Sequence, residues 1–529
     1  MLTKPAPILM IGLDGFELEI ANRLLGEGRL PALARLKEGG ATILLDHGEA
    51  KRTGLAWEHI STGLAPDAAG RWGAIDFNPR TYRAAQAPTR LTPVFEGLDL
   101  TTVAFDVPCF DLAKAKGVRG SSNWGAHDPG VARSSRPASL AGEIEARFGA
   151  YAATPWIYGF VWHSVEQTEK IGADLVRAVD VRSQATQWLF SDRLPDWDIA
   201  VTVVSEYHSA VEALWHGVDP AHPLYSQPSS GPARRGLEAV YEAGDRMLGD
   251  LMERFPEARL VAFSPHGMGP NKADVPSMLL LPELLFRDTF GRPFFREPDW
   301  RRSPDGVPLL EPDGSWHEQI SGGFPGAVGP LKRWGRRIGG LLRRLGGFQA
   351  VHSGALDWMP AARYKEFWRQ MPAFALPAYY DGRIRINLIG RERHGLVAAD
   401  GYDETCDHIE NLVRECRDAI TGEPISATFI RPGGDKFALD PSEADLVIVW
   451  DGAPLGLIHP RLGQIGPIPY RRTGGHTGGH GVAYFSDSAG LDNVSQMSAF
   501  DLVPTVLEMA GHRPVQGISG RSVLQGLAP

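Results

Sequence analysis

A histidine and a glutamate lie four residues apart in the segment SEYHSAVEALWHGVD. These residues, His208 and Glu212, would share one face of a helix, where both could bind a single metal ion. The ordinary alternative for such a pair is a surface contact between the imidazole and the carboxylate. The spacing therefore indicates a candidate metal site that other ligands would have to complete.

Two more histidines stand in a setting that is poor material for a protein core. His476 and His480 lie in the glycine-rich stretch TGGHTGGHGVAYF. Glycines let a backbone approach a ligand closely, and neutral imidazole is a common metal donor. Either histidine could supply a further ligand.

Two polar residues stand at the ends of predicted strands. Asp14 directly follows the apolar run ILMIGL. His266 follows the run RLVAFS, from which only Pro265 separates it. Sites in open α/β folds form at the carboxyl ends of strands, so both residues occupy suitable ligand positions. For Asp14, the dipeptide Asp-Gly is also an ordinary turn.

A threonine precedes a predicted helix in the segment AKRTGLAWEHISTG. The hydroxyl of this residue, Thr53, would lie at the helix N-terminus, where a metal ion and the helix dipole could stabilise it as a nucleophilic alkoxide. A threonine that only caps the helix is the structural alternative.

Short apolar runs alternate with helical patterns along the chain. Because the runs do not alternate strictly with polar residues, they are typical of strands that are covered on both faces. The sequence therefore predicts an α/β fold with a largely parallel sheet between helix layers. The runs span residues 8–13, 101–107, 197–205, 259–264, 383–390, 444–450 and 481–486.

One region departs from this rhythm. Residues 290–350 are rich in Pro, Gly, Arg and Trp, and they contain the basic amphipathic stretch LKRWGRRIGGLLRRLGG at 331–347. This stretch could contact a membrane surface, close over an anionic substrate, or form a solvated helix in an insertion.

Composition and charge exclude several classes of function. The net charge of −9 gives no electrostatic footprint for nucleic acid. No pair among the three cysteines has metal-ligand spacing, so neither a disulfide framework nor a cysteine zinc site is indicated. No apolar run is long enough to span a membrane, and the N-terminus lacks the pattern of a signal peptide. We expect a cytoplasmic protein, whose oligomeric state the sequence leaves open.

Taken in order, these segments resemble the type I phosphodiesterase/nucleotide pyrophosphatase family of the alkaline phosphatase superfamily. GLDGF and GRLPALARLKEGGA are similar to its opening strand and helix, and TGLAWEHISTGLAPDAAG is similar to its nucleophile segment. The remaining similar segments are SEYHSAVEALWHGVDPAHPLY, FSPHGMG, INLIGRERHGLV and DLVPTVLEMAGHRPVQGISGRSV. The resemblance covers nearly the whole chain. It implies an alkaline-phosphatase-like core at 1–275 and 376–529, with an inserted cap at 276–375.

The resemblance also implies a pair of metal ions, usually zinc, that clamp a phosphoryl group while a threonine or serine attacks. Carried onto this sequence, Asp14, Thr53 and His266 belong to one metal site, and Thr53 is the nucleophile. His476 takes the place of the last histidine of the other site, for which His480 is a less well aligned alternative. The expected substrate is small, anionic and phosphorylated.

The sequence departs from the family at three positions. The family's middle segment has an aspartate and then a histidine four residues later, whereas here His208 precedes Glu212. The charge and donor count stay the same, so a divalent ion should still bind. Pro265 stands where the family has a ligating aspartate, and proline has no side-chain donor. We expect one firm metal site and a second that is weak or absent, unless Glu58 replaces the missing carboxylate.

Two other readings follow from the same departures. Two histidines and one carboxylate are also the pattern of mononuclear iron sites, so iron or manganese could replace zinc and the chemistry could differ. The chain could also be a binding protein that keeps the fold without catalysis. A sulfatase is disfavoured, because Cys109 lacks the sulfatase motif and the nucleophile position holds Thr53.

Overall fold

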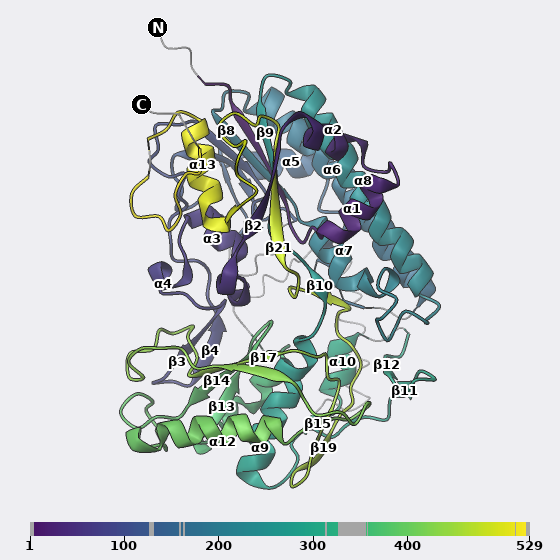
Figure 1. Cartoon of the computed structure of the whole chain (residues 1–529), viewed down its shortest axis with the longest axis vertical. Coiled ribbons are helices and arrows are strands. Elements are labelled where there is room, and N and C mark those ends of the chain that lie inside the picture. The colour runs from purple at the N-terminus through teal and green to yellow at the C-terminus, as the bar shows by residue number, and fades with distance from the viewer. Residues whose placement is uncertain are drawn as a thin grey trace. The chain divides into compact units, whose positions relative to one another are not determined.

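In the computed structural model the chain divides into two units (Figure 1). The first unit comprises Met1–Trp72, Pro88–Asn271 and Arg472–Pro529, and the second comprises Gly73–Ala87 and Lys272–Arg471. The structure describes residues 5–125, 132–157, 160–161, 164–312, 315–325, 356, 358–513 and 515–524.

The first unit is built on a nine-stranded sheet in the order β22-β2-β21-β9-β1-β8-β5-β6-β7. Strand β1 pairs in parallel with both β8 and β9, whereas β21 runs antiparallel to both of its neighbours. The strands are β1 (Ile8–Leu13), β2 (Ala41–Asp46), β5 (Thr102–Phe105), β6 (Val118–Ser122), β7 (Ser134–Arg136), β8 (Ile199–Val204), β9 (Arg259–His266), β21 (His480–Phe485) and β22 (Gln496–Ser498). The predicted α/β fold with a mostly parallel sheet is confirmed.

Helices cover both faces of this sheet (Figure 1). Alternate residues of β1 enter two separate cores: Leu9 and Ile11 pack with α1, α2, α6, α7 and α8, whereas Ile8 and Met10 pack with α3 and α13. Burial on both faces explains why the first strand is a continuous apolar run. The helices are α1 (Leu18–Gly26), α2 (Pro31–Gly39), α3 (Ala56–Thr62), α4 (Pro66–Ala69), α5 (Leu140–Phe148), α6 (Val165–Trp188), α7 (Glu206–Leu214), α8 (Ser230–Arg254) and α13 (Leu502–Met509).

The second unit contains an antiparallel sheet in the order β13-β14-β17-β16. Its strands are β13 (Ala373–Leu376), β14 (Gly382–Ile386), β16 (Ala427–Ile430) and β17 (Leu446–Trp450), and its shorter strands are β3 (Ile75–Asn78), β4 (Arg83–Gln86), β11 (Arg301–Arg302), β12 (Pro308–Leu309), β15 (Arg417–Asp418), β18 (Leu457–His459) and β19 (Gly463–Ile465). Its α-helices include α9 (Leu281–Phe290), α10 (Trp316–Ser321) and α12 (Tyr402–Arg414).

Two predicted strands therefore belong to a different sheet from the one expected. The runs 383–390 and 444–450 form β14 and β17, which pair with each other in the second unit instead of joining the central sheet. Alternate residues of β17 are only half-buried, as in a sheet covered unevenly on its two faces. The sequence of β17 does not reveal which sheet the strand joins, because both of its faces carry apolar side chains.

The boundaries of the second unit differ from the expected cap at 276–375. The unit begins at Lys272, close to the expected position, but it continues to Arg471 and takes in Gly73–Ala87. The pairing of β14 with β17 is the reason, because it places the chain after residue 375 in the second unit. The basic stretch 331–347 lies outside the described residues.

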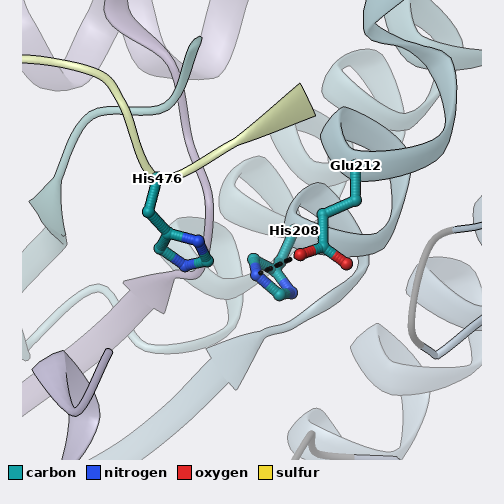
Figure 2. A group of neighbouring side chains, drawn as sticks. All are labelled: His208, Glu212 and His476. Atoms are coloured by element: carbon teal, nitrogen blue, oxygen red, sulfur yellow. Dashed lines mark ion pairs between the residues drawn. The ribbon is translucent and has the colours of Figure 1, made fainter. Parts of the chain in front are cut away.

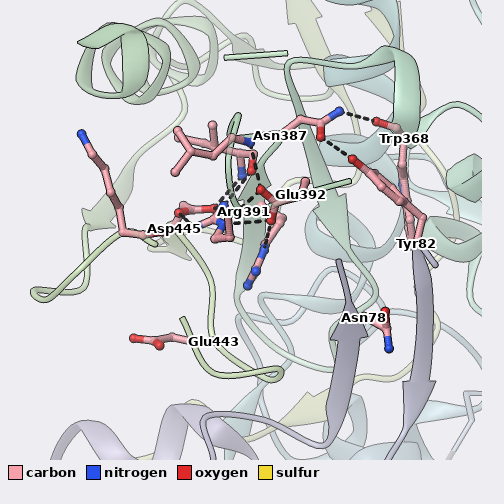
Figure 3. A network of polar contacts seen from close by, with 12 residues as sticks. Asn78, Tyr82, Trp368, Asn387, Arg391, Glu392, Glu443 and Asp445 are labelled. Atoms are coloured by element: carbon pink, nitrogen blue, oxygen red, sulfur yellow. Dashed lines mark hydrogen bonds and ion pairs between the residues drawn. The ribbon is translucent and has the colours of Figure 1, made fainter. Parts of the chain in front are cut away.

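The segment INLIGRERHGLV forms a buried polar network within the second unit (Figure 3). Arg391 donates two hydrogen bonds of 2.7 Å to the carboxylate of Asp445. Glu392 accepts from the backbone N–H of Leu388, and Asn387 accepts from the hydroxyl of Tyr82. These contacts satisfy buried charges and backbone groups, so the segment stabilises the second unit.

Among the described residues, no helix is long and apolar enough to cross a membrane.

Candidate metal centre

Helix α7 begins directly after β8, so the carboxyl edge of the sheet leads straight into the helix that carries His208 and Glu212. Gly15, in the turn after β1, fixes the position of this helix. Its φ is +76°, and a Cβ atom there would lie 2.5 Å from the Cα atom of His208. Only glycine fits, because the backbone is left-handed and the neighbouring helix is too close for a side chain.

His208, Glu212 and His476 come together as a group of potential metal ligands (Figure 2). One donor atom from each residue lies within 4.8 Å of the other two. His208 Nε2 is 3.3 Å from Glu212 Oε1, and the rings of His208 and His476 have centroids 4.9 Å apart. Glu212 is buried, whereas both histidines are partly exposed. It is the one such group of three or more found in the part of the chain that the structure describes.

The segment that carries His476 is fixed to helix α7 by its backbone. The N–H of Thr473 donates a 2.8 Å hydrogen bond to the carbonyl of Glu212. Strand β20 (Gly474–Gly475) follows, and a Cβ atom on Gly474 would lie 2.2 Å from the carbonyl oxygen of Val211. Glycine is therefore required for the segment to lie against α7, which brings a ligand from the far end of the sequence to the helix.

An arginine from the same segment contacts the carboxylate of the group. Arg472 forms an ion pair with Glu212 Oε1. Both side chains are buried, with 5% and 1% of their surface exposed. Burial lowers the pKa of Arg472 to about 9. Sequence reasoning did not single out Arg472, because nothing in a lone arginine of a loop indicates contact with a distant helix.

Asp14 and Thr53 form hydrogen bonds with residues outside the group of His208, Glu212 and His476. Trp57 Nε1 donates a 2.7 Å hydrogen bond to Asp14 Oδ1, and burial, partly opposed by this bond, raises the pKa of Asp14 to about 7. Thr53 ends a 3₁₀ helix (Gly48–Thr53) and donates a 2.8 Å hydrogen bond to the carbonyl of Ala50. A helix does follow Thr53, as predicted, because α3 begins at Ala56, but Thr53 is not its cap, since Leu55 is the N-cap residue.

His266 connects the end of β9 to the group of ligands. Its ring centroid is 4.9 Å from that of His476, and its Nδ1 lies 3.0 Å from the carbonyl of Gly267. Burial lowers the pKa of His266, so the imidazole is neutral at pH 7. Because Nδ1 faces the carbonyl of Gly267, the other ring nitrogen, Nε2, can act as a metal ligand. His480 is exposed and pairs with His266 in the sheet, and it is absent from the group that contains His476.

Glu58, the candidate replacement for the missing carboxylate, is engaged elsewhere. Its Oε1 lies 2.8 Å from Arg71 Nε, and both side chains are buried. This ion pair neutralises Glu58, so the structure offers no support for Glu58 as a metal ligand in place of Pro265.

Two further histidines lie next to His266 and were not singled out from the sequence. His47 Nε2 is 2.9 Å from His59 Nδ1, and both rings are buried. The ring of His47 stacks on that of His266 at 6.3 Å. His47 directly follows β2, and this position at a strand end, which it shares with His266, is the sequence signal that could have found it.

The His208–Glu212–His476 group fits a divalent metal ion. Two imidazoles and one carboxylate are a common donor set for zinc and for other divalent transition metals, and three protein ligands leave positions open for water or substrate. Thr53, Asp14 and His266 supply donors of suitable type for a second ion, but Pro265 contributes none.

The fold and this group agree with the result of family comparison. A model described as type I phosphodiesterase / nucleotide pyrophosphatase matches residues 8–287, more than half of the chain. The chain belongs to this family. The predicted family is therefore confirmed.

Solved structures with low sequence identity align over almost the whole chain. Phosphonoacetate hydrolase from Sinorhizobium meliloti 1021, in complex with phosphonoformate, is 17% identical over 96% of each chain, with a TM-score of 0.42. Human ectonucleotide pyrophosphatase / phosphodiesterase 5 is 11% identical over 98% of this chain and 100% of that chain, with a TM-score of 0.47. Among curated proteins, no sequence match was found.

Proposed function

We propose that this protein is a metal-dependent hydrolase of phosphodiesterase type that uses Thr53 as its nucleophile. The observation that carries the proposal is the convergence of His208, Glu212 and His476 in a member of this family. The favoured ion is zinc, with iron or manganese as alternatives, and the favoured substrate is a small phosphorylated anion.

A divalent ion bound by His208, Glu212 and His476 would supply positive charge for the phosphoryl oxygens and leave positions open for substrate or water. The chain's own backbone would hold these ligands in place, because Thr473 and Gly474 lie against α7 close to His476 and Gly15 lies against the backbone of His208. The buried, neutral His266 would provide a further nitrogen donor beside the group.

Thr53 would be the group that bonds covalently to the substrate. Thr53 Oγ1, whose hydroxyl now donates to the carbonyl of Ala50, would bond to phosphorus while the bond between phosphorus and the leaving oxygen breaks, and the hydroxyl proton would pass to the leaving oxygen. Water then attacks phosphorus, the bond to Thr53 Oγ1 breaks, and the hydroxyl regains a proton.

The direct test is hydrolysis of an aryl phosphodiester by chelator-treated protein after zinc, manganese or iron is added back. We expect metal-dependent turnover by the wild type, and a loss of at least about a thousandfold in Thr53→Ala. Thr53 Oγ1 donates to the carbonyl of Ala50 and accepts from the N–H of Leu55. Thr505→Ala is the matched control, because the hydroxyl of Thr505 likewise donates to the carbonyl of Asp501 and accepts from the N–H of Val523. Equal inactivity of the wild type and Thr53→Ala with every ion would contradict the proposal.

One observation favours a second candidate, a mononuclear enzyme with different chemistry. The group contains two histidines and one carboxylate, which is the donor set of mononuclear iron sites, and Pro265 removes a ligand of the second ion. Elemental analysis decides between the two. Two equivalents of zinc per chain would exclude the mononuclear enzyme, and one equivalent of iron without phosphodiesterase activity would favour it.

A further inference from the structure

Arg472 places a positive charge on the carboxylate that the metal ion would use. It is paired with Glu212 Oε1, in the same group as His208 Nε2 at 3.3 Å from that oxygen. The backbone fixes the position of Arg472, because the N–H of the adjacent Thr473 donates a hydrogen bond to the carbonyl of Glu212. The segment therefore delivers both a ligand, His476, and a competing cation to α7.

The other buried arginines of the first unit have a different setting. Arg71 pairs with Glu58, which lies outside the group of ligands. Arg182 is held by two carboxylates, those of Asp106 and Glu206. The ion pair of Arg472 involves Glu212, a residue of the candidate metal centre, so its charge bears directly on metal binding.

The charges of the site change when an ion binds. Without an ion, Glu212 and Arg472 form a neutral buried pair. A divalent ion at Glu212 adds two positive charges next to the guanidinium, and buried charge without compensation is unfavourable. A phosphoryl dianion would supply the missing negative charge, and the planar fork of arginine donors fits its oxygens.

We propose that Arg472 couples metal binding to anion binding: it competes with the ion for Glu212 when no anion is present, and it binds the phosphoryl anion once the ion is in place. This inference rests on the proposed function, whose metal centre it uses. Because such coupling is reciprocal, phosphate should tighten metal binding and metal should tighten phosphate binding by the same factor.

The test is calorimetric titration of metal-free protein with Co²⁺, with and without inorganic phosphate, after subtraction of a protein-free blank. In the wild type, phosphate should lower the Kd for Co²⁺ by about tenfold or more. In Arg472→Met, Co²⁺ alone should bind more tightly than to the wild type, and phosphate should change its Kd by less than about threefold. Equal or weaker binding of Co²⁺ alone to Arg472→Met, or an undiminished effect of phosphate, would overturn the inference.

Two further variants make the result specific. Arg71→Met is the matched control, because it removes a buried arginine paired with a glutamate outside the centre, and it should keep the wild-type effect of phosphate. Arg472→Lys keeps the positive charge and should retain part of the coupling. If Arg472→Met does not fold, as judged by circular dichroism, Arg472→Gln takes its place with the same expected results.

The outcome separates this inference from the proposed function. Turnover of an aryl phosphodiester by wild type, together with undiminished coupling in Arg472→Met, would overturn the inference alone. Coupling that depends on Arg472 in a protein without turnover would overturn the proposed function alone.

Discussion

His47 and His59 form a pair of buried imidazoles beside the candidate metal centre. Their ring nitrogens Nδ1 of His47 and Nε2 of His59 are buried and have no hydrogen-bond partner among the described residues. Burial lowers the pKa of His59 to about 3 and places the pKa of His47 well below its ordinary value. Both side chains are therefore neutral at pH 7, and protonating either one opposes folding.

This burial predicts that the protein loses stability in acid. Because the pKa of His59 is lower in the folded state, its contribution to stability is fully present above about pH 6.5 and is lost as the pH falls toward 3. From pH 7 to pH 5, this group alone should lower the free energy of unfolding by about 2 kcal/mol. Urea denaturation at the two pH values should show a correspondingly smaller loss in His59→Gln than in the wild type.

The matched control for His59→Gln is His408→Gln, since His408 is half-exposed and contacts Asp288 in the second unit. It should leave the difference between pH 7 and pH 5 close to that of the wild type. An identical pH dependence in His59→Gln and the wild type would show that His59 is not protonated on unfolding in this range.

Pro265 is the residue whose replacement tests the second metal site. It lies in β9 between Ser264 and His266, and an aspartate there would add a carboxylate donor at the end of the strand. We predict that Pro265→Asp raises the metal content of the protein above that of the wild type, toward two equivalents per chain, as measured by elemental analysis. In Pro265→Asn, the side chain has nearly the same shape as aspartate but no charge, so this variant should bind less metal than Pro265→Asp. Unchanged metal content in Pro265→Asp would contradict this account of the site.

Among the elements, the sequence named His208, Glu212 and His476 as candidate ligands, but it did not predict the contacts between α7 and the segment that carries His476. The helical spacing of His208 and Glu212 is a local property, so it could be recognised directly from the sequence. The contact of Arg472 with Glu212 depends on how β20 lies against α7, which is a tertiary contact between segments more than 250 residues apart. No local pattern encodes such a contact.

The close approach of β20 to α7 makes a prediction about Gly474. A valine at this position would collide with the carbonyl of Val211, so the segment should move away from the helix and take His476 with it. We expect Gly474→Val to weaken metal binding by at least about 10–100-fold, the range seen for changes around metal ligands. Calorimetric titration with Co²⁺ measures this effect.

Gly479 offers the control for this substitution within the same glycine-rich stretch. A Cβ atom there would meet no atom within 4 Å. Gly479→Val should therefore bind Co²⁺ like the wild type, and equal weakening in both variants would show that the contact with Val211 is not what positions His476.

At the scale of the whole molecule, apolar runs predicted the strands but not the sheets to which they belong. Strands β1 and β8 are buried along their whole length, so continuous apolar runs marked them clearly. The runs that form β14 and β17 look similar in sequence, and only their pairing in three dimensions assigns them to the second unit. The division into units at Lys272 and Arg471 follows from that pairing.

We propose that His208, Glu212 and His476 bind a divalent ion in a phosphodiesterase-type enzyme. Anomalous diffraction at the zinc edge, from crystals of the full chain grown with zinc, tests the metal site most directly. We predict the strongest anomalous peak at about 2.0–2.2 Å from one nitrogen of each histidine and an oxygen of Glu212. An empty position there, or a strongest peak bound only by Asp14, Thr53 and His266, would contradict this account.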